Sequence, residues 1–142
     1  MEKNRKKLAT QLFNEKYNCA QAIMVAYSDL VNINEETAFK IATGFGGGMA
    51  RMGKTCGTIN AAVMILSLMH GGTEKGDIES TEKTRKIVRE FIKEFSAKHK
   101  GINCTDLLTE DEGSNHTMHS GKCESVVSEV CDLLDKYLQI EK

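Results

Sequence analysis

The chain contains no proline and no tryptophan, and aromatic residues occupy only 6% of its 142 positions. Without proline, no helix is interrupted by a missing backbone N–H, so long helices are allowed throughout. An excess of one charge is also lacking, because 19 Lys and Arg stand against 20 Asp and Glu, for a net charge of −1. This balance gives no electrostatic reason to expect nucleic acid or an anionic membrane as a partner.

Long hydrophobic runs are lacking as well. The longest, Ile59 to Met69, is broken by Asn60 and Ser67 and is shorter than the ~20 residues of a membrane-spanning helix. The first residues are charged, and no apolar segment of the kind found in secretion signals follows them. We therefore expect a cytoplasmic protein, in which five cysteines are more typical of metal ligands or redox thiols than of structural disulfides.

The apolar residues that are present recur with helical spacing along nearly the whole chain. Asn18 and Gln21 have the spacing of a capping box, and Gly44 is suited to a left-handed helix stop. Neither a strand pattern nor a repeat is evident. The sequence predicts an all-α fold, a single domain over residues 1–142 with about five main helices, short connections and a glycine-rich bend. The predicted helices run from Asn4 to about Phe13, Asn18 through Leu30, Asn34 to Gly44, Cys56 to about His70, Ser80 to about Lys98, and from Gly121 onward, with a short turn from Asn103 to Leu108.

The glycine-rich segment GMARMGKTCG, residues 48–57, matches the spelling of a phosphate-binding loop. Such a loop requires a buried strand before it, whereas the residues before Gly44 have the pattern of a capped amphipathic helix. Bulky side chains also fill the positions at which the backbone would wrap a phosphate. We therefore interpret the segment as a bend that leads to Cys56, with Thr55 as the expected helix cap.

Four cysteines share one kind of position. Cys19, Cys56, Cys104 and Cys123 each fall in the first turn of a predicted helix, after the cap candidates Asn18, Thr55, Asn103 and Ser120. Free N–H groups and the helix dipole favour negative charge there, so a thiol can become the thiolate that binds metals and attacks disulfides. The four thiols are expected to converge at one end of the bundle.

Other sulfur and imidazole groups are weaker candidates. Cys131 lies in the middle of the last helix on its apolar stripe, and we expect it in the core. His116 and His119 precede Cys123 and could add imidazole ligands to a metal site, although the surrounding residues are typical of a solvated loop. His99 is expected to face solvent at the end of its helix.

The four cysteines and their surroundings resemble the C-GCAxxG-C-C family of small bacterial and archaeal proteins, which is inferred to be redox-active. The matching pieces are YNCAQAI, GFGGGMARMGKTCG, INCTDLL and KCESVV, in the order of the family and over nearly the whole chain. The family's characteristic cysteines fall on Cys19, Cys56, Cys104 and Cys123, and Cys131 lies outside the pattern. The resemblance implies that these four thiols form the active group, as catalytic residues or as cofactor and metal ligands.

Two redox mechanisms agree with this set. The four thiolates could hold an iron–sulfur cluster that passes electrons, or they could cycle between dithiol and disulfide without a metal. A structural zinc site in a helical module that mediates protein interactions is the alternative without catalysis. We expect a redox partner protein, and neither nucleic acid nor membrane as partner; a homodimer is compatible with the sequence.

Overall fold

The computed structural model describes residues 4–109 and 121–139, and within these ranges the predicted all-α fold is confirmed. The elements in chain order are α1 (Arg5–Asn14), α2 (Cys19–Tyr27), α3 (Glu35–Ala42), the 3-10 turn η1 (Thr43–Phe45), α4 (Gly57–His70), α5 (Ile78–Ser96), α6 (Cys104–Leu108) and α7 (Gly121–Tyr137). Over the same ranges the chain forms no strand, and one isolated antiparallel bridge pairs Thr55 with Asn103.

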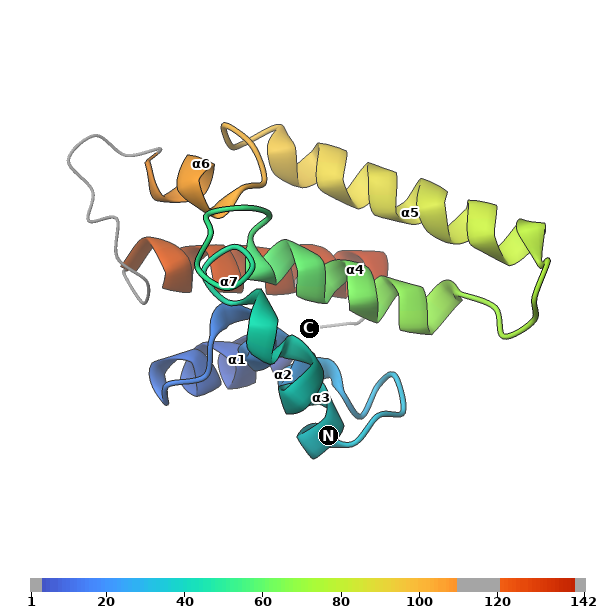
Figure 1. Ribbon diagram of the computed structural model, residues 1–142, viewed down its shortest axis with the longest axis horizontal. Coiled ribbons are helices and arrows are strands. Elements are labelled where there is room, and N and C mark those ends of the chain that lie inside the picture. The colour runs from blue at the N-terminus through green and yellow to red at the C-terminus, as the bar shows by residue number, and fades with distance from the viewer. Residues whose placement is uncertain (1–3, 110–120, 140–142) are drawn as a thin grey trace.

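Helices α2, α4 and α7 pack against one another at the centre of the bundle. Figure 1 shows α5 along one side of this centre and α1 and α3 on the other. Every residue from Ala20 to Tyr27 is buried, so α2 is enclosed on all sides by α1, α3, α4 and α7. The glycine-rich bend between η1 and α4 lies at the end of the bundle where α6 and α7 begin (Figure 1). This end carries the candidate site.

Asparagine caps fix the starts of three helices. The side chains of Asn4, Asn18 and Asn34 each accept a hydrogen bond from the backbone N–H three residues later. At Asn18 the predicted capping box is confirmed, because the Gln21 side-chain oxygen also accepts a hydrogen bond from the Asn18 N–H at 3.0 Å. Each such cap stabilises its helix by about 1 kcal/mol. The caps explain why the predicted starts of these helices agree with the structure.

Three predicted helix ends are wrong. Helix α2 ends at Tyr27 rather than Leu30. The hydroxyl of the next residue, Ser28, donates a hydrogen bond to the Val25 carbonyl at 2.8 Å. Helix α5 begins at Ile78, before Ser80, because the Asp77 carboxylate accepts the Ser80 N–H at 3.0 Å. Gly44 does not supply a left-handed stop, since α3 continues directly into η1 and the left-handed backbone begins only at Gly47.

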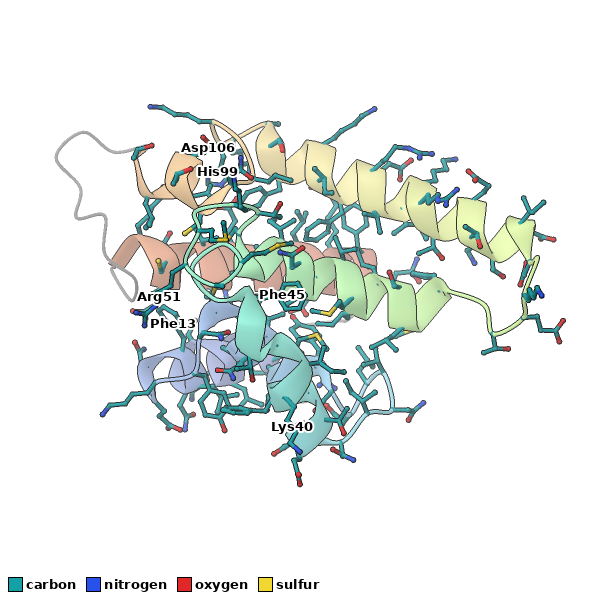
Figure 2. The ribbon with its side chains drawn as sticks, in the orientation of Figure 1. Phe13, Lys40, Phe45, Arg51, His99 and Asp106 are labelled. Carbon is teal, nitrogen blue, oxygen red and sulfur yellow. The ribbon has the colours of Figure 1, made fainter. Side chains whose placement is uncertain are left out.

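The expectation that His99 faces solvent is also wrong. Its side chain is only 7% exposed, and its Nε2 lies 2.7 Å from Oε2 of Glu129 on α7. The ring stacks on Phe95, with 4.3 Å between the ring centroids. Figure 2 shows His99 just beyond the end of α5, turned toward the bundle. The contact attaches the chain between α5 and α6 to α7.

None of the helices within the described ranges is both long and apolar enough to cross a lipid bilayer. Helix α4, which is buried over most of its surface, has 14 residues. This is shorter than the ~20 residues that the apolar thickness of a membrane requires.

A buried polar pair joins α2 to α7 at the end of the bundle away from the glycine-rich bend. The Tyr27 hydroxyl donates to Oδ1 of Asp135 at 2.6 Å, and both residues are buried. Removing the hydroxyl in Tyr27→Phe leaves the Asp135 carboxyl group without this donor in a buried setting. We expect the free energy of unfolding to fall by about 2–3 kcal/mol, measured by urea denaturation and circular dichroism.

Tyr137→Phe is the matched control for this prediction. The Tyr137 hydroxyl also donates to a carboxylate, Oε1 of Glu94, at 3.0 Å, but this pair is partly exposed. Glu94 also keeps a bond from Lys136 at 2.6 Å. The control should therefore lose less than about 1 kcal/mol. Equal losses in the two variants would contradict the importance of the buried pair.

Candidate functional site

The four cysteines predicted to lie at helix starts do so, with one correction. Cys19 and Cys104 are the first residues of α2 and α6, and Cys123 is the third residue of α7. Cys56 itself occupies the cap position of α4, so the prediction that Thr55 is the cap is wrong. Thr55 is instead paired with Asn103 in the isolated bridge, which fixes its backbone outside the helix.

The structure brings these four thiols to one small cavity. Cys19, Cys56, Cys104 and Cys123 all line a space of about 30 Å³ at the end of the bundle. The rest of its wall is mainly apolar, from Phe13 on α1, Leu107 and Leu108 on α6, and Val126 on α7. Cys56 is 7% exposed, while the other three cysteines are partly exposed. The cavity therefore encloses Cys56 most deeply.

The bridge between Thr55 and Asn103 sets the relative position of two of the thiols. The Cys56 N–H donates to the Ile102 carbonyl at 2.7 Å, and the Cys104 N–H donates to the Lys54 carbonyl at 2.6 Å. Neighbours of a paired residue on an extended chain lie on the opposite face from it. Cys56 and Cys104 therefore emerge on the same face of the bridge, as diagonal neighbours whose Cα atoms are about 7–8 Å apart.

The glycine-rich bend wraps the site with left-handed backbone. Residues 47–51 all have positive φ, including the non-glycine residues Met49 (61°), Ala50 (53°) and Arg51 (64°). Such a conformation costs about 1–2 kcal/mol for each residue that carries a Cβ. Hydrogen bonds of 2.8 Å from the Ala50 N–H to the Gly44 carbonyl and 2.9 Å from the Lys54 N–H to the Gly48 carbonyl help to hold it.

The bend touches the cysteines through its backbone. The Gly47 N–H donates to the sulfur of Cys19. A Cβ at Gly48 would lie 2.7 Å from the Cβ of Cys104, so only glycine fits against this thiol. Arg51 is exposed, and in Figure 2 its side chain points away from the bundle. The segment therefore acts on Cys19 through the backbone N–H of Gly47. The charged side chain of Arg51 does not point toward the thiols.

Two of the thiols, Cys19 and Cys56, shift each other's pKa in opposite directions. The interaction with the Cys19 thiol lowers the pKa of Cys56 below its ordinary value, against the opposing effect of burial. The Thr58 hydroxyl, 3.0 Å from Cys56 Sγ, and the N–H groups of Thr58 and Ile59 lower it further. The same interaction and burial raise the pKa of Cys19. The pair therefore favours a thiolate on Cys56 and a protonated thiol on Cys19.

Cys104 and Cys131 are in different surroundings from this pair. Burial, with the negative charges of Cys56 and Cys123, raises the pKa of Cys104 to about 11. Cys131 is fully buried in the core, as expected, and burial raises its pKa to about 12. Cys131 does not line the cavity. Both thiols stay protonated at neutral pH.

The donor set is chemically suited to a soft metal, because thiolates bind zinc and iron–sulfur clusters. Among the residues that the structure describes, however, no three His, Cys, Asp or Glu side chains are arranged to hold one metal ion. His116 and His119, the predicted additional ligands, lie outside the described residues. The four thiols share one cavity wall.

The context that a phosphate-binding loop requires is not found around residues 48–55. Helix α3 and the turn η1 precede the segment where the motif needs a strand. Its Lys54 side chain is exposed, and its Lys54 carbonyl is occupied by the Cys104 N–H. The segment is a bend that leads to Cys56, as the sequence interpretation proposed, although Cys56 rather than Thr55 is the cap of α4.

Sequence reasoning missed three contributors to the site. The Thr58 hydroxyl, the Gly47 N–H and Lys122 on the cavity wall were not among the predicted residues. A threonine two residues after a cap-position cysteine is a local signal that could have been recognised. The contacts of Gly47 and Lys122 depend on how distant segments pack, so no local pattern indicates them.

The lowered pKa of Cys56 predicts how the protein titrates. A group with a lowered pKa ionises at a lower pH than an ordinary thiol, whose pKa is about 8.5. The ultraviolet absorbance of thiolate should therefore show an early step in the acidic-to-neutral range from Cys56, followed by alkaline steps from Cys104 and Cys131. Cys56→Ala should remove the early step and Cys131→Ala should keep it. An early step that persists in Cys56→Ala would contradict the assignment.

The fold and the site together define a class of protein: an all-α bundle in which four cysteines at helix starts line one cavity. A family model described as "Putative redox-active protein (C_GCAxxG_C_C)" matches residues 17–137, a span that contains all four of these cysteines. The chain belongs to this family, and the resemblance noted in the sequence is confirmed. Searches of curated proteins and of solved structures returned no match.

Proposed function

We propose that the protein is a thiol–disulfide redox protein in which Cys56 is the nucleophile and Cys19 the resolving thiol. The observation that carries this proposal is that Cys19 Sγ lies beside the chain at Cys56, only 2.7 Å from where a Cβ of the neighbouring Gly57 would stand, and that both thiols line one cavity. Each of the two thiols also shifts the pKa of the other. Cys104 is a less suitable partner, since diagonal neighbours at about 7–8 Å exceed the usual Cα separation in a disulfide.

The proposed cycle moves two electrons. In the oxidation, the Cys56 thiolate attacks a small disulfide or peroxide and forms a bond to one of its atoms, while the leaving group departs with the electron pair. Cys19 then loses its proton and attacks Cys56 Sγ, closing the Cys19–Cys56 disulfide and releasing the second product. A dithiol on a redox partner protein then attacks the partly exposed Cys19 sulfur, returns two electrons and two protons, and becomes a disulfide itself. Cys104 and Cys123 border the pair and contribute to its electrostatic environment.

An iron–sulfur cluster held by Cys19, Cys56, Cys104 and Cys123 is the second candidate. The observation that favours it is that all four thiols line the same cavity. Such a cluster would supply one-electron transfer, and zinc bound by the same residues would instead stabilise the bundle and its interactions with other proteins. In this candidate the chain's own contribution is to orient the thiolates and to shield them with Phe13, Leu107 and Leu108.

The test begins with anaerobic purification, followed by iron, sulfide and zinc analysis and a visible spectrum. Metal-free protein is then equilibrated in a dithiothreitol redox buffer until the ratio of forms is constant, and the disulfides are mapped by mass spectrometry. We expect one Cys19–Cys56 disulfide that reverts on reduction. Iron with sulfide and visible absorption would favour the cluster, and stoichiometric zinc the structural site. Metal-free protein that forms no Cys19–Cys56 disulfide would refute the leading proposal.

A further inference from the structure

The cavity restricts what can reach the nucleophile. Cys56 is 7% exposed and lies on the wall of a space of about 30 Å³. This is far below the ~150 Å³ of a cavity that holds a benzene-sized molecule, so the space accepts only a small molecule. A peptide disulfide, or glutathione disulfide, cannot enter without displacing Phe13, Leu107 or Leu108.

The side chains that line the cavity also favour uncharged molecules over ions, and the cavity is open on one side. The cavity presents carbon atoms to an entering molecule from four buried side chains, those of Phe13, Leu107, Leu108 and Val126. Cys19, Cys104, Cys123 and Lys122 line the same cavity and are partly exposed, so it opens on their side. A small uncharged molecule loses less hydration free energy than an ion on entering such a space.

We infer that the oxidant of this site is a small hydroperoxide of the size of hydrogen peroxide, and that larger disulfides are excluded from Cys56. This inference rests on the proposed dithiol function and adds the chemical class of its substrate. Hydrogen peroxide has two heavy atoms, no charge, and hydrogen-bonding groups at both ends. It is therefore small enough to enter the cavity and finds polar partners in the thiols and in Thr58.

The polar groups around Cys56 match the steps of this reaction. The Cys56 thiolate attacks one peroxide oxygen, the O–O bond breaks, and Cys56 becomes a sulfenic acid. The Cys19 thiol, which interacts with Cys56, gives its proton to the leaving oxygen, which departs as water. The resulting Cys19 thiolate attacks the Cys56 sulfur, and hydroxide leaves as the disulfide closes. The Thr58 hydroxyl, 3.0 Å from Cys56 Sγ, is placed to hold the peroxide or the sulfenic oxygen.

The test compares oxidants on the reduced, metal-free protein. Rates of Cys19–Cys56 disulfide formation are measured with hydrogen peroxide, tert-butyl hydroperoxide and glutathione disulfide at equal concentration, with a free cysteine peptide as reference. We expect the ratio of protein rate to peptide rate to be at least about tenfold higher for hydrogen peroxide than for the two larger oxidants. In Cys19→Ser, hydrogen peroxide should leave a Cys56 sulfenic acid that a dimedone probe labels.

Widening the cavity should relax this selection. Leu108→Ala removes part of the wall, and we expect the rate with tert-butyl hydroperoxide to rise by about tenfold relative to hydrogen peroxide. Leu133→Ala, a partly buried leucine on α7 outside the cavity wall, is the matched control and should leave the ratio unchanged. Leu108→Val serves the same purpose with a smaller loss of packing if Leu108→Ala does not fold.

The outcomes separate this inference from the function on which it rests. If the redox buffer forms the Cys19–Cys56 disulfide at equilibrium, but glutathione disulfide reacts as fast as hydrogen peroxide relative to the peptide, the substrate inference is wrong and the dithiol function stands. An unchanged ratio in a folded Leu108 variant would also overturn the selection. If no oxidant and no redox buffer forms the disulfide, the proposed function itself fails.

Discussion

Replacing Gly57 with alanine is expected to separate the two sulfur atoms of the reactive pair. A Cβ at Gly57 would lie 2.7 Å from the sulfur of Cys19, 2.8 Å from the Phe45 carbonyl oxygen and 3.2 Å from the Ala20 Cβ. Real Cβ atoms do not approach other atoms so closely, and the helix behind Ala20 is held in place by backbone. We therefore expect the Cys19 side chain, the more flexible of the two close contacts, to change position relative to Cys56, and the Phe45 carbonyl must shift as well.

Three measurements follow from this displacement. The free energy of unfolding should fall by about 1–3 kcal/mol, the usual cost of overpacking. The early thiolate step should move to higher pH, because the interaction with the Cys19 thiol is the largest effect that lowers the pKa of Cys56. Closure of the Cys19–Cys56 disulfide should slow by about a hundredfold, the order expected for a misplacement of about 1 Å between reacting groups.

Gly121→Ala is the matched control for Gly57→Ala. Both glycines are the first residue of a helix, α7 and α4 respectively, but a Cβ at Gly121 would meet nothing within 4 Å. Alanine there should be neutral or stabilise the protein by about 0.4–1 kcal/mol through the unfolded chain. It should leave thiol titration and disulfide closure unchanged. If Gly57→Ala behaves like Gly121→Ala, the contact of Gly57 with Cys19 does not position the pair.

Features fixed by residues near in sequence could be predicted from the sequence. Asn18 and Gln21 bond to each other's backbone within one turn, so their spacing alone indicated the capping box. Cys19 and Cys104 were assigned to helix starts because each follows an asparagine that precedes an apolar helix pattern. The helices themselves follow from the spacing of apolar residues that now lie in the core.

Features fixed by distant contacts could not be predicted in this way. Thr55 has the properties of a helix cap, but pairing with Asn103 prevents that role and passes it to Cys56. The sequence around His99 is typical of a solvated helix end, but in the structure its side chain is enclosed by Glu129 on α7 and by Phe95. The cavity also depends on distant contacts, because its walls come from α1, α2, α4, α6, α7 and the glycine-rich bend. Sequence spacing indicated that four thiols could meet, and only packing sets which two of them interact.

Removing the sulfur of Cys56 is expected to abolish the redox reaction. In Cys56→Ala the remaining thiols at the cavity are Cys19, Cys104 and Cys123. Burial still raises the pKa of Cys19 and of Cys104, although the contribution of Cys56 to both shifts is lost. Without the favoured thiolate, we expect the rate of thiol loss with hydrogen peroxide to fall by at least about a hundredfold, since the thiolate and not the thiol is the nucleophile. No Cys19–Cys56 disulfide can form, and mass spectrometry should find none.

Cys131→Ala separates this chemical effect from an effect on packing. Cys56 and Cys131 are both buried, and the two variants remove the same sulfur atom, so each should lower the free energy of unfolding by about 1 kcal/mol. Only Cys56 lines the cavity and interacts with Cys19, so only its loss should remove the reaction. Equal loss of activity in two folded variants would mean that Cys131 contributes to the chemistry, and the division between a reactive pair and a structural thiol would be wrong. Retained activity in Cys56→Ala would assign the nucleophile to another thiol on the cavity wall.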